Sequence, residues 1–260
     1  MITMASDPGQ IGVFLASMAG TLTLFFTALL TIAGVGAAFI LIPIFLWLGI
    51  DIHTAMATAL LLNSIAMIFA SYRFYKKKLI MWKVALPILI IATILSPLGA
   101  WVSQFLNRTI LLWLFVTFLV FAAAMMLFYT PKKHKETHSK TTEMIYGGTV
   151  GAFAGFLGGL LGVGGGNFIV PVLVWLGYNP KKASATTSFI VIFSSFSGFL
   201  GHATVGAINW LLLLATGLGS AGGALIGSWL MTDKLNRKHV KLIIGLVLIG
   251  IAIKMIIGLI

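Results

Sequence analysis

Residues 162–189 read GVGGGNFIVPVLVWLGYNPKKASATTSF, and this stretch decides how the rest of the chain is interpreted. Its glycines permit sharp turns and close approach of the backbone, because they carry no Cβ atom. The apolar run that follows, 167–178, contains a Trp-Leu-Gly sequence near its end and is too short to cross about 30 Å of hydrocarbon as a helix. We therefore expect a glycine-broken or re-entrant helix, which persists in a membrane only where protein or water satisfies its backbone.

A second copy of this pattern lies 128 residues earlier, where residues 34–49 read GVGAAFILIPIFLWLG. The same shift superimposes glycines, prolines and tryptophans over most of the chain without gaps. The matched pairs include Gly34 and Gly162, Gly36 and Gly164, Pro43 and Pro171, Trp47 and Trp175, Trp82 and Trp210, and Gly99 and Gly227. Prolines and tryptophans matched at one fixed offset indicate that the chain consists of two homologous halves.

The composition excludes most classes of soluble protein. Apolar residues make up 60% of the 260 residues and charged residues only 8%, against about 25% charged in typical globular proteins. We predict an all-α polytopic membrane protein with five apolar segments in each half. The segments are 11–33, 37–49, 54–72, 80–105, 110–130, 144–163, 167–178, 183–203, 209–231 and 240–260. The predicted parts are an N-terminal tail (1–10), a first repeat (11–130), a cytoplasmic linker (131–143) and a second repeat (144–260).

The basic residues predict the orientation of the chain in the membrane. The formal net charge is +12, and the excess collects in the loops 73–83, 131–143 and 232–241, which we expect on the cytoplasmic side. The loop 106–109 holds one arginine, and the loop 201–209 holds no lysine or arginine, as expected outside. Corresponding loops of the two halves then face opposite sides, which predicts an inverted-topology repeat with both termini outside. Lys254, in the last segment, fits this orientation less well.

The glycine-rich stretch is also the predicted binding site. The start of the segment 167–178 presents free backbone N–H groups and the positive end of the helix dipole, which suit an anion. A tight interhelical turn without a ligand explains the same glycines equally well. The expected substrate-binding residues, from both halves, are Gly164, Gly165, Gly166, Asn167, Thr187, Ser188, Thr58, Asn63, Gly34 and Gly36.

Other chemistries find little support in the sequence. The chain has no cysteine, no HExxH or GxSxG motif and no paired carboxylates, so we expect no enzyme, no metal and no cofactor. None of the five acidic residues lies in the middle of a span, which leaves a buried-carboxylate proton relay unsupported. Arg73, His202 and His53 lie near segment ends and are candidates for a vestibule or for coupling. The lysines serve orientation and lipid head groups, and no nucleic-acid partner is expected.

The stretch GVGGGNFIVPVLVWLGYNPKKASATTSFIVIFSSFSGFLGH (162–202) resembles the TauE/SafE family of membrane proteins, often called sulfite exporters. That family has a GxGGG–x–Pro segment followed by a stretch with an alanine and a Thr-Ser pair in both halves. The second copy here matches at Gly162, Gly164, Gly165, Gly166, Pro171, Ala183, Thr187 and Ser188. The first copy keeps Gly34, Gly36 and Pro43, but Ala37 and Ala38 replace glycines and ATAL (57–60) lacks the serine. The basic segment RFYKKKLIMW (73–82) also fits the family.

The resemblance implies transport of sulfite, an organosulfonate or a related anion, often outward and coupled to an ion gradient such as that of H⁺. We therefore expect a multi-pass secondary transporter of the inner cell membrane that works by alternating access. The second half should contribute more to the site than the first. A passive anion channel is the alternative, and a non-transporting membrane scaffold is a more distant one.

Overall fold

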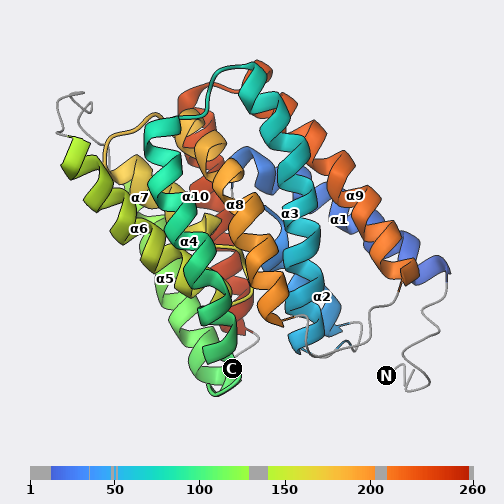
Figure 1. The fold of residues 1–260 in the computed structure, drawn as a ribbon. Coiled ribbons are helices and arrows are strands. Elements are labelled where there is room, and N and C mark those ends of the chain that lie inside the picture. Colours follow the sequence, from blue (N-terminus) through green and yellow to red (C-terminus); the bar gives the residue numbers. More distant parts are fainter. Residues whose placement is uncertain are drawn as a thin grey trace.

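The computed structural model describes residues 13–34, 36–47, 50, 52–128, 140–202 and 210–257, and this part of the chain is helical without strands (Figure 1). In chain order the helices are α1 (Val13–Ala33), α2 (Ala38–Trp47), α3 (Ile52–Lys76), α4 (Trp82–Ser103), α5 (Arg108–Phe128), α6 (Lys140–Leu160), α7 (Gly166–Trp175), α8 (Pro180–His202), α9 (Trp210–Trp229), the π-helical turn η1 (Leu230–Lys234) and α10 (Arg237–Ile257).

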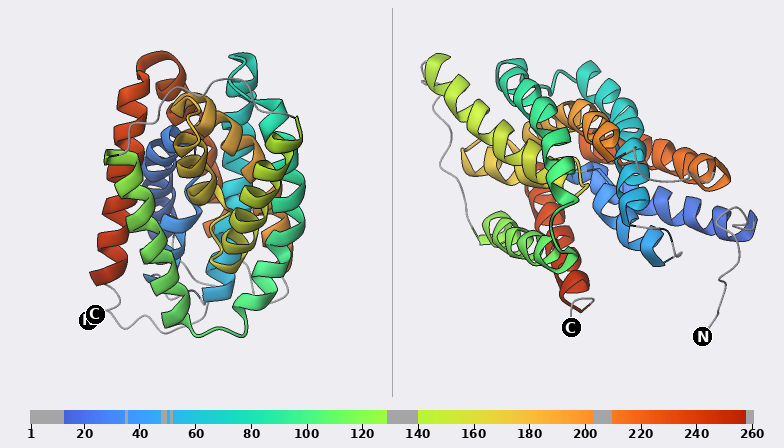
Figure 2. Two further views of the ribbon diagram at one scale, coloured as in Figure 1. Left: turned by 90° about the vertical axis from the view of Figure 1, so that its left-hand side faces the viewer. Right: turned by 60° about the horizontal axis from the view of Figure 1, so that its bottom comes forward.

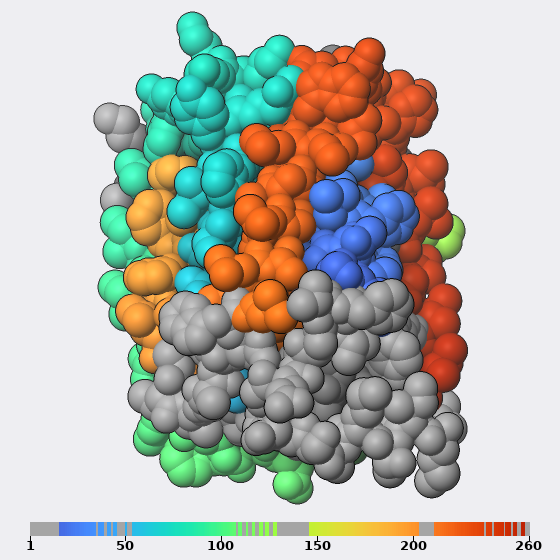
Figure 3. All heavy atoms as spheres, turned by 90° about the vertical axis from the view of Figure 1, so that its right-hand side faces the viewer, coloured from blue at the N-terminus to red at the C-terminus, as the bar shows by residue number. Residues whose placement is uncertain are grey.

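The helices have the length and composition of membrane spans. Within the described residues, five stretches are long and apolar enough to cross a bilayer: Ala16–Ala33, Thr54–Lys76, Trp82–Ser103, Pro180–His202 and Leu211–Lys234. Many large apolar side chains lie on the outer surface, including Phe25, Ile94 and Leu218. Figure 3 shows one such face, on which α3, α9 and α1 lie side by side. The prediction of an all-α polytopic membrane protein is confirmed.

Two helices are much shorter than the others. α2 and α7 have ten residues each, so each spans about 15 Å, half the thickness of the hydrocarbon core. Both follow the predicted glycine breaks, and both end at the tryptophan of a Trp-Leu-Gly sequence. A ten-residue helix cannot cross the bilayer alone. Each half therefore contains one half-length helix that begins just after a glycine break.

The bounds of the helices repeat along the chain. A shift of 128 residues moves α2 onto the bounds of α7 and moves α1, α3, α4 and α5 to within three residues of α6, α8, α9 and α10. The packing between the halves shows the same repeat. α1 packs along α9, and their counterparts under the shift, α6 and α4, pack along each other (Figure 2). α3 packs against α8, and α5 pairs with α10 at one side of the bundle. Helices of one half thus find most of their neighbours in the other half.

Individual contacts exchange in the same way. An added Cβ at Gly34 would overlap Ser184, and an added Cβ at Gly162 would overlap Met56. The 128-residue shift converts the first of these pairs into the second. The pairs Gly99 with Phe156 and Gly227 with Ala28 exchange as well. The Ser64 hydroxyl donates to the Ile192 carbonyl across 2.8 Å, and these two residues are themselves 128 apart.

The regularly spaced glycines lie at the closest helix contacts. Gly219, Gly223 and Gly227 of α9 meet, in order, the backbone of Gly20, Leu24 and Ala28 of α1, where any Cβ would meet a carbonyl oxygen. On the other side, glycines of α6 pack on the α4 backbone in the same parallel sense. Small residues at four-residue spacing let membrane helices approach closely.

Candidate functional site

Both glycine breaks use backbone conformations that favour glycine. Gly34 and Gly36, between α1 and α2, have φ of 74° and 75°, and Gly162, Gly164 and Gly165, between α6 and α7, have φ from 67° to 76°. A side chain in this left-handed region costs roughly 1–2 kcal/mol, because its Cβ crowds the following carbonyl. The two turns are therefore built alike, although Ala37 and Ala38 replace two of the three successive glycines in the first half.

The two breaks meet at the side chain of Asn63. This residue is fully buried near the middle of α3. A Cβ at Gly36 would overlap its Oδ1 atom, and a Cβ at Gly164 would lie 2.9 Å from its Nδ2 atom and overlap the Ser195 hydroxyl. Asn63 Nδ2 donates to Ser195 Oγ across 3.0 Å. One amide, bonded to α8, thus lies between the glycine turns of both halves.

Serine hydroxyls of α8 hold the two breaks in place. Ser194 Oγ donates to the Gly164 carbonyl and Ser184 Oγ to the Ala33 carbonyl, each across 3.0 Å. Carbonyls at a chain break lack helical partners, and a buried carbonyl without one is costly. The serines of α8 therefore satisfy backbone groups that the glycine turns leave open, one turn in each half.

Several buried polar atoms at or beside these turns have no hydrogen-bond partner among the described residues. They are Asn63 Oδ1, both amide atoms of Asn167 and the Thr187 hydroxyl, and all three side chains are 0% exposed. Asn167 lies in the first turn of α7, directly after the glycines. Leaving a buried polar group unpaired costs about 1–3 kcal/mol. Groups held at such a cost suit a polar ligand, because the ligand would supply the missing partners.

The structure links the remaining predicted site residues less closely to the two glycine turns. Gly166 begins α7 and is buried. Ser188 donates to the Ser184 carbonyl of its own helix across 2.9 Å, so its proton is already used. Thr58 is buried on α3, but five residues from Asn63, which puts it about 140° around the helix. Ser194 and Ser195 were not among the predicted residues, although they follow Thr187 and Ser188 by two helical turns.

The candidates near helix ends lie at different places in the bundle. His202 is buried at the end of α8, where its Nε2 lies 3.0 Å from the Gly159 carbonyl, which also accepts from the N–H of Gly162 at the break before α7. Arg73 lies at the other end of the bundle, near the end of α3. The side chain of His53 is outside the described residues. The 128-residue shift matches Arg73 to the residue just before His202, and the antiparallel packing of α3 and α8 separates the two side chains (Figure 1).

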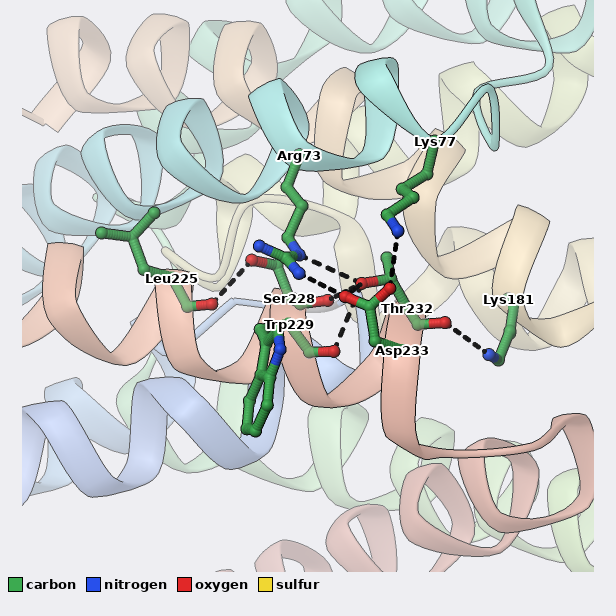
Figure 4. A network of polar contacts seen from close by, with 8 residues as sticks. All are labelled: Arg73, Lys77, Lys181, Leu225, Ser228, Trp229, Thr232 and Asp233. Atoms are coloured by element: carbon green, nitrogen blue, oxygen red, sulfur yellow. Dashed lines mark hydrogen bonds and ion pairs between the residues drawn. The ribbon is translucent and has the colours of Figure 1, made fainter.

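Arg73 belongs to a polar network that joins the two halves (Figure 4). Its guanidinium pairs with Asp233 of η1, and its Nε donates to Thr232 Oγ1 across 3.1 Å. Lys77 Nζ donates to Asp233 Oδ1 across 2.6 Å. Lys181, at the start of α8, donates to the Thr232 carbonyl across 3.1 Å. Sequence reasoning did not predict the role of Asp233, because a residue 160 positions away becomes a neighbour only through the fold.

The described side chains that meet at Asn63 and Ser195 are not ionisable. α1, α2 and α7 contain none in their sequences. Along α8 the nearest to Ser195 is His202, about 10 Å away by helical rise, and along α3 Arg73 is about 15 Å from Asn63. No group of three or more potential metal ligands exists among the described residues. The central groups are therefore neutral amides, hydroxyls and backbone dipoles.

Comparison with known proteins places the chain in a family. The model of the family described as "Sulfite exporter TauE/SafE" matches residues 13–255. A probable membrane transporter protein of Bacillus subtilis, YunE, is 27% identical over 87% of this chain and 92% of its own length. A probable membrane transporter protein of Methanocaldococcus jannaschii is 30% identical over 68% of each chain.

A plant relative shares a shorter segment. Sulfite exporter TauE/SafE family protein 1 of Arabidopsis thaliana is 45% identical over 73 residues, which are 28% of this chain and 14% of its own. No solved structure matches the chain significantly. The family match covers both halves, both glycine breaks and the basic network, and the family consists of membrane transporters rather than enzymes. The chain therefore belongs to the TauE/SafE family of membrane transporters.

Proposed function

We propose that this transporter moves a small anion, such as sulfite, an organosulfonate or a related carboxylate, outward by alternating access. The observation that supports this most strongly is the meeting of the two glycine turns at Asn63. There, buried amide and hydroxyl groups have no partner among the described residues, and two of these amide atoms belong to Asn167 at the N-terminus of α7. Such a terminus favours anions through its free N–H groups and its dipole.

Alternating access requires two halves that can exchange roles. The exchange of contacts under the 128-residue shift supports an inverted repeat, in which α3 and α8 run in opposite directions on either side of a pseudo-two-fold axis. In this proposal Gly164, Gly165, Gly166, Asn167 and Thr187 bind the anion from one side, and Gly34, Gly36 and Asn63 face them. Ser188, which bonds within its own helix, and Thr58, on another face of α3, contribute less. Sulfur oxyanions are suggested by the family alone.

Flux into vesicles tests the proposal. Purified protein in proteoliposomes should move labelled sulfite, methanesulfonate or acetate faster than protein-free vesicles do. A secondary transporter should also accumulate the anion against its gradient until an uncoupler collapses the driving force. Equilibration without accumulation under any imposed ion gradient would favour the passive channel, and no flux of any of these anions would contradict the proposed function.

The basic network is expected to hold one end of the bundle closed. Asp233→Asn removes the carboxylate that pairs with Arg73 and Lys77, and it leaves two cations adjacent. The chain has no cysteine, so Ser71→Cys supplies a single probe at a buried position two residues before Arg73. We expect a maleimide to label this cysteine severalfold faster in the Asp233→Asn background.

A matched control separates this effect from a general change in surface charge. Lys238→Gln neutralises an exposed cation at the same end of the bundle but outside the network. Lys238→Gln should leave the labelling rate of the Ser71→Cys probe unchanged. In the Asp233→Glu background, which keeps the carboxylate, the probe should be labelled more slowly than in the Asp233→Asn background. Equal labelling rates in all of these backgrounds would exclude a gating role for the network.

The proposed orientation places the linker in the cytoplasm. Apart from Lys254 near the end of α10, the lysines of the described helices and Arg73 lie at the end of the bundle where α3 ends and α4, α8 and α10 begin (Figure 1). Cytoplasmic loops carry an excess of lysine and arginine. A membrane-impermeant maleimide should therefore label Ser139→Cys only in inside-out vesicles and Asn107→Cys only in intact cells. The reverse pattern would mean that the orientation is inverted.

A further inference from the structure

We propose that the central site selects singly charged oxyanions and excludes doubly charged ones, an inference that rests on the proposed anion transport. The groups that meet at Asn63 and Ser195 are neutral, and the described ionisable side chains that follow them on the same helices, His202 on α8 and Arg73 on α3, are about 10 Å and 15 Å away by helical rise. Arg73 pairs with Asp233, and His202 Nε2 lies at the Gly159 carbonyl.

A neutral site discriminates strongly between one charge and two. The free energy needed to remove an ion from water grows with the square of its charge, so a dianion costs about four times as much as a monoanion of the same size. The attraction of fixed amide, hydroxyl and helix dipoles grows only in proportion to the charge. A neutral site therefore penalises a dianion more than a monoanion, and the described residues that meet at Asn63 offer no cationic side chain to offset the difference.

Within the class of singly charged anions, the hydrogen-bond pattern favours one that keeps an acidic proton, such as hydrogen sulfite, over one that offers acceptors only, such as methanesulfonate. The unpartnered atoms include donors, Asn167 Nδ2 and Thr187 Oγ1, and acceptors, Asn63 Oδ1 and Asn167 Oδ1. Because Asn63 Nδ2 already donates to Ser195, its oxygen is the amide atom left free. A fully deprotonated oxyanion offers only acceptors and would leave the two amide oxygens unmatched. An anion that keeps one acidic proton can also donate to them.

Three anions of similar size test this inference in proteoliposomes. Methanesulfonate carries one charge at every pH used, sulfate carries two, and sulfite changes from one to two as it loses its second proton near neutral pH. The membrane potential is clamped with potassium and valinomycin. Protein-free vesicles correct for sulfur dioxide that crosses the lipid at low pH.

The expected result is a flux that follows the monoanion. Methanesulfonate flux should be independent of pH, and sulfate flux should not exceed that of protein-free vesicles. Above the pH of the second ionisation of sulfite, its flux should fall about tenfold for each pH unit, because the concentration of the singly charged form falls by the same factor. The flat methanesulfonate profile rules out titration of the protein as the cause of that fall.

Two other outcomes overturn the inference. Sulfate flux close to that of methanesulfonate would show that charge is not discriminated, as would sulfite flux that follows total sulfite. Either result would leave anion transport itself intact. If none of the three anions is carried, the proposed function fails and the charge selectivity fails with it.

Discussion

Gly36→Ala is expected to abolish transport and to lower the thermal stability of the protein. The new Cβ would overlap Asn63 Oδ1, which is buried and cannot move into solvent. The backbone at φ 75° adds strain of roughly 1–2 kcal/mol for any residue with a Cβ. Transport is measured in proteoliposomes, and stability by thermal unfolding in detergent followed by size-exclusion chromatography.

A second substitution separates the overlap from the backbone strain. Asn63→Ala removes the amide that the new Cβ meets, so the double variant Gly36→Ala, Asn63→Ala should be more stable than Gly36→Ala alone. It should still not transport, because the central amide is missing. Gly250→Ala is the matched control, since nothing lies within 4 Å of its Cβ position, and it should change neither property. A Gly36→Ala protein with normal stability and flux would contradict the proposed site.

Asn167→Leu is expected to raise stability while it abolishes transport. Both amide atoms of Asn167 are buried without partners among the described residues, and leucine has the same branched arrangement of heavy atoms but no polar atom. Removal of an unsatisfied buried amide should stabilise the protein by about 1–3 kcal/mol. The same change removes a donor from the anion site. Opposite changes in stability and activity are typical of residues kept for function.

Two further variants compare a hydroxyl without a partner with a hydroxyl that has one. Thr187→Val removes another unpartnered hydroxyl with little change in shape, so it should lower flux without lowering stability. Ser188→Ala removes a hydroxyl that bonds within its own helix and should have a small effect on both. Asn167→Leu with full transport activity would remove Asn167 from the site, and Asn167→Leu with reduced stability would mean that its amide is satisfied in the native protein.

Hydropathy and glycine spacing predicted the number, order and approximate bounds of the helices, including the two short ones. The ends were less predictable. α3 continues to Lys76, four residues beyond the predicted apolar segment, because basic residues can extend a helix past the hydrocarbon. α8 begins at Pro180, before two lysines, since proline is well suited to the first position of a helix. α6 begins at Lys140, within the stretch 131–143 expected as a linker.

The candidate site could be predicted only where one residue type is costly or unusual in a membrane helix. An intramembrane asparagine and a glycine break are recognisable in the sequence, and on that basis Asn63, Gly36 and Gly164 were predicted; the structure brings these three residues together. Ser195 was not identified, because a serine in a membrane helix commonly bonds to its own backbone. Its role depends on the pairing of α3 with α8. The partnership of Arg73 with Asp233 has the same origin, since η1 reaches α3 only in the assembled bundle.

The exchange of packing partners between halves also affects how the protein is made. α1 packs along α9, α4 along α6 and α3 against α8, so each of these first-half helices is completed by one synthesised later. The chain emerges from the ribosome N-terminus first. The backbone around Gly20 and Gly99 must therefore face lipid, or an insertion factor, until the second half enters the membrane. Insertion of the helices and their assembly are consequently separate stages in the biogenesis of this transporter.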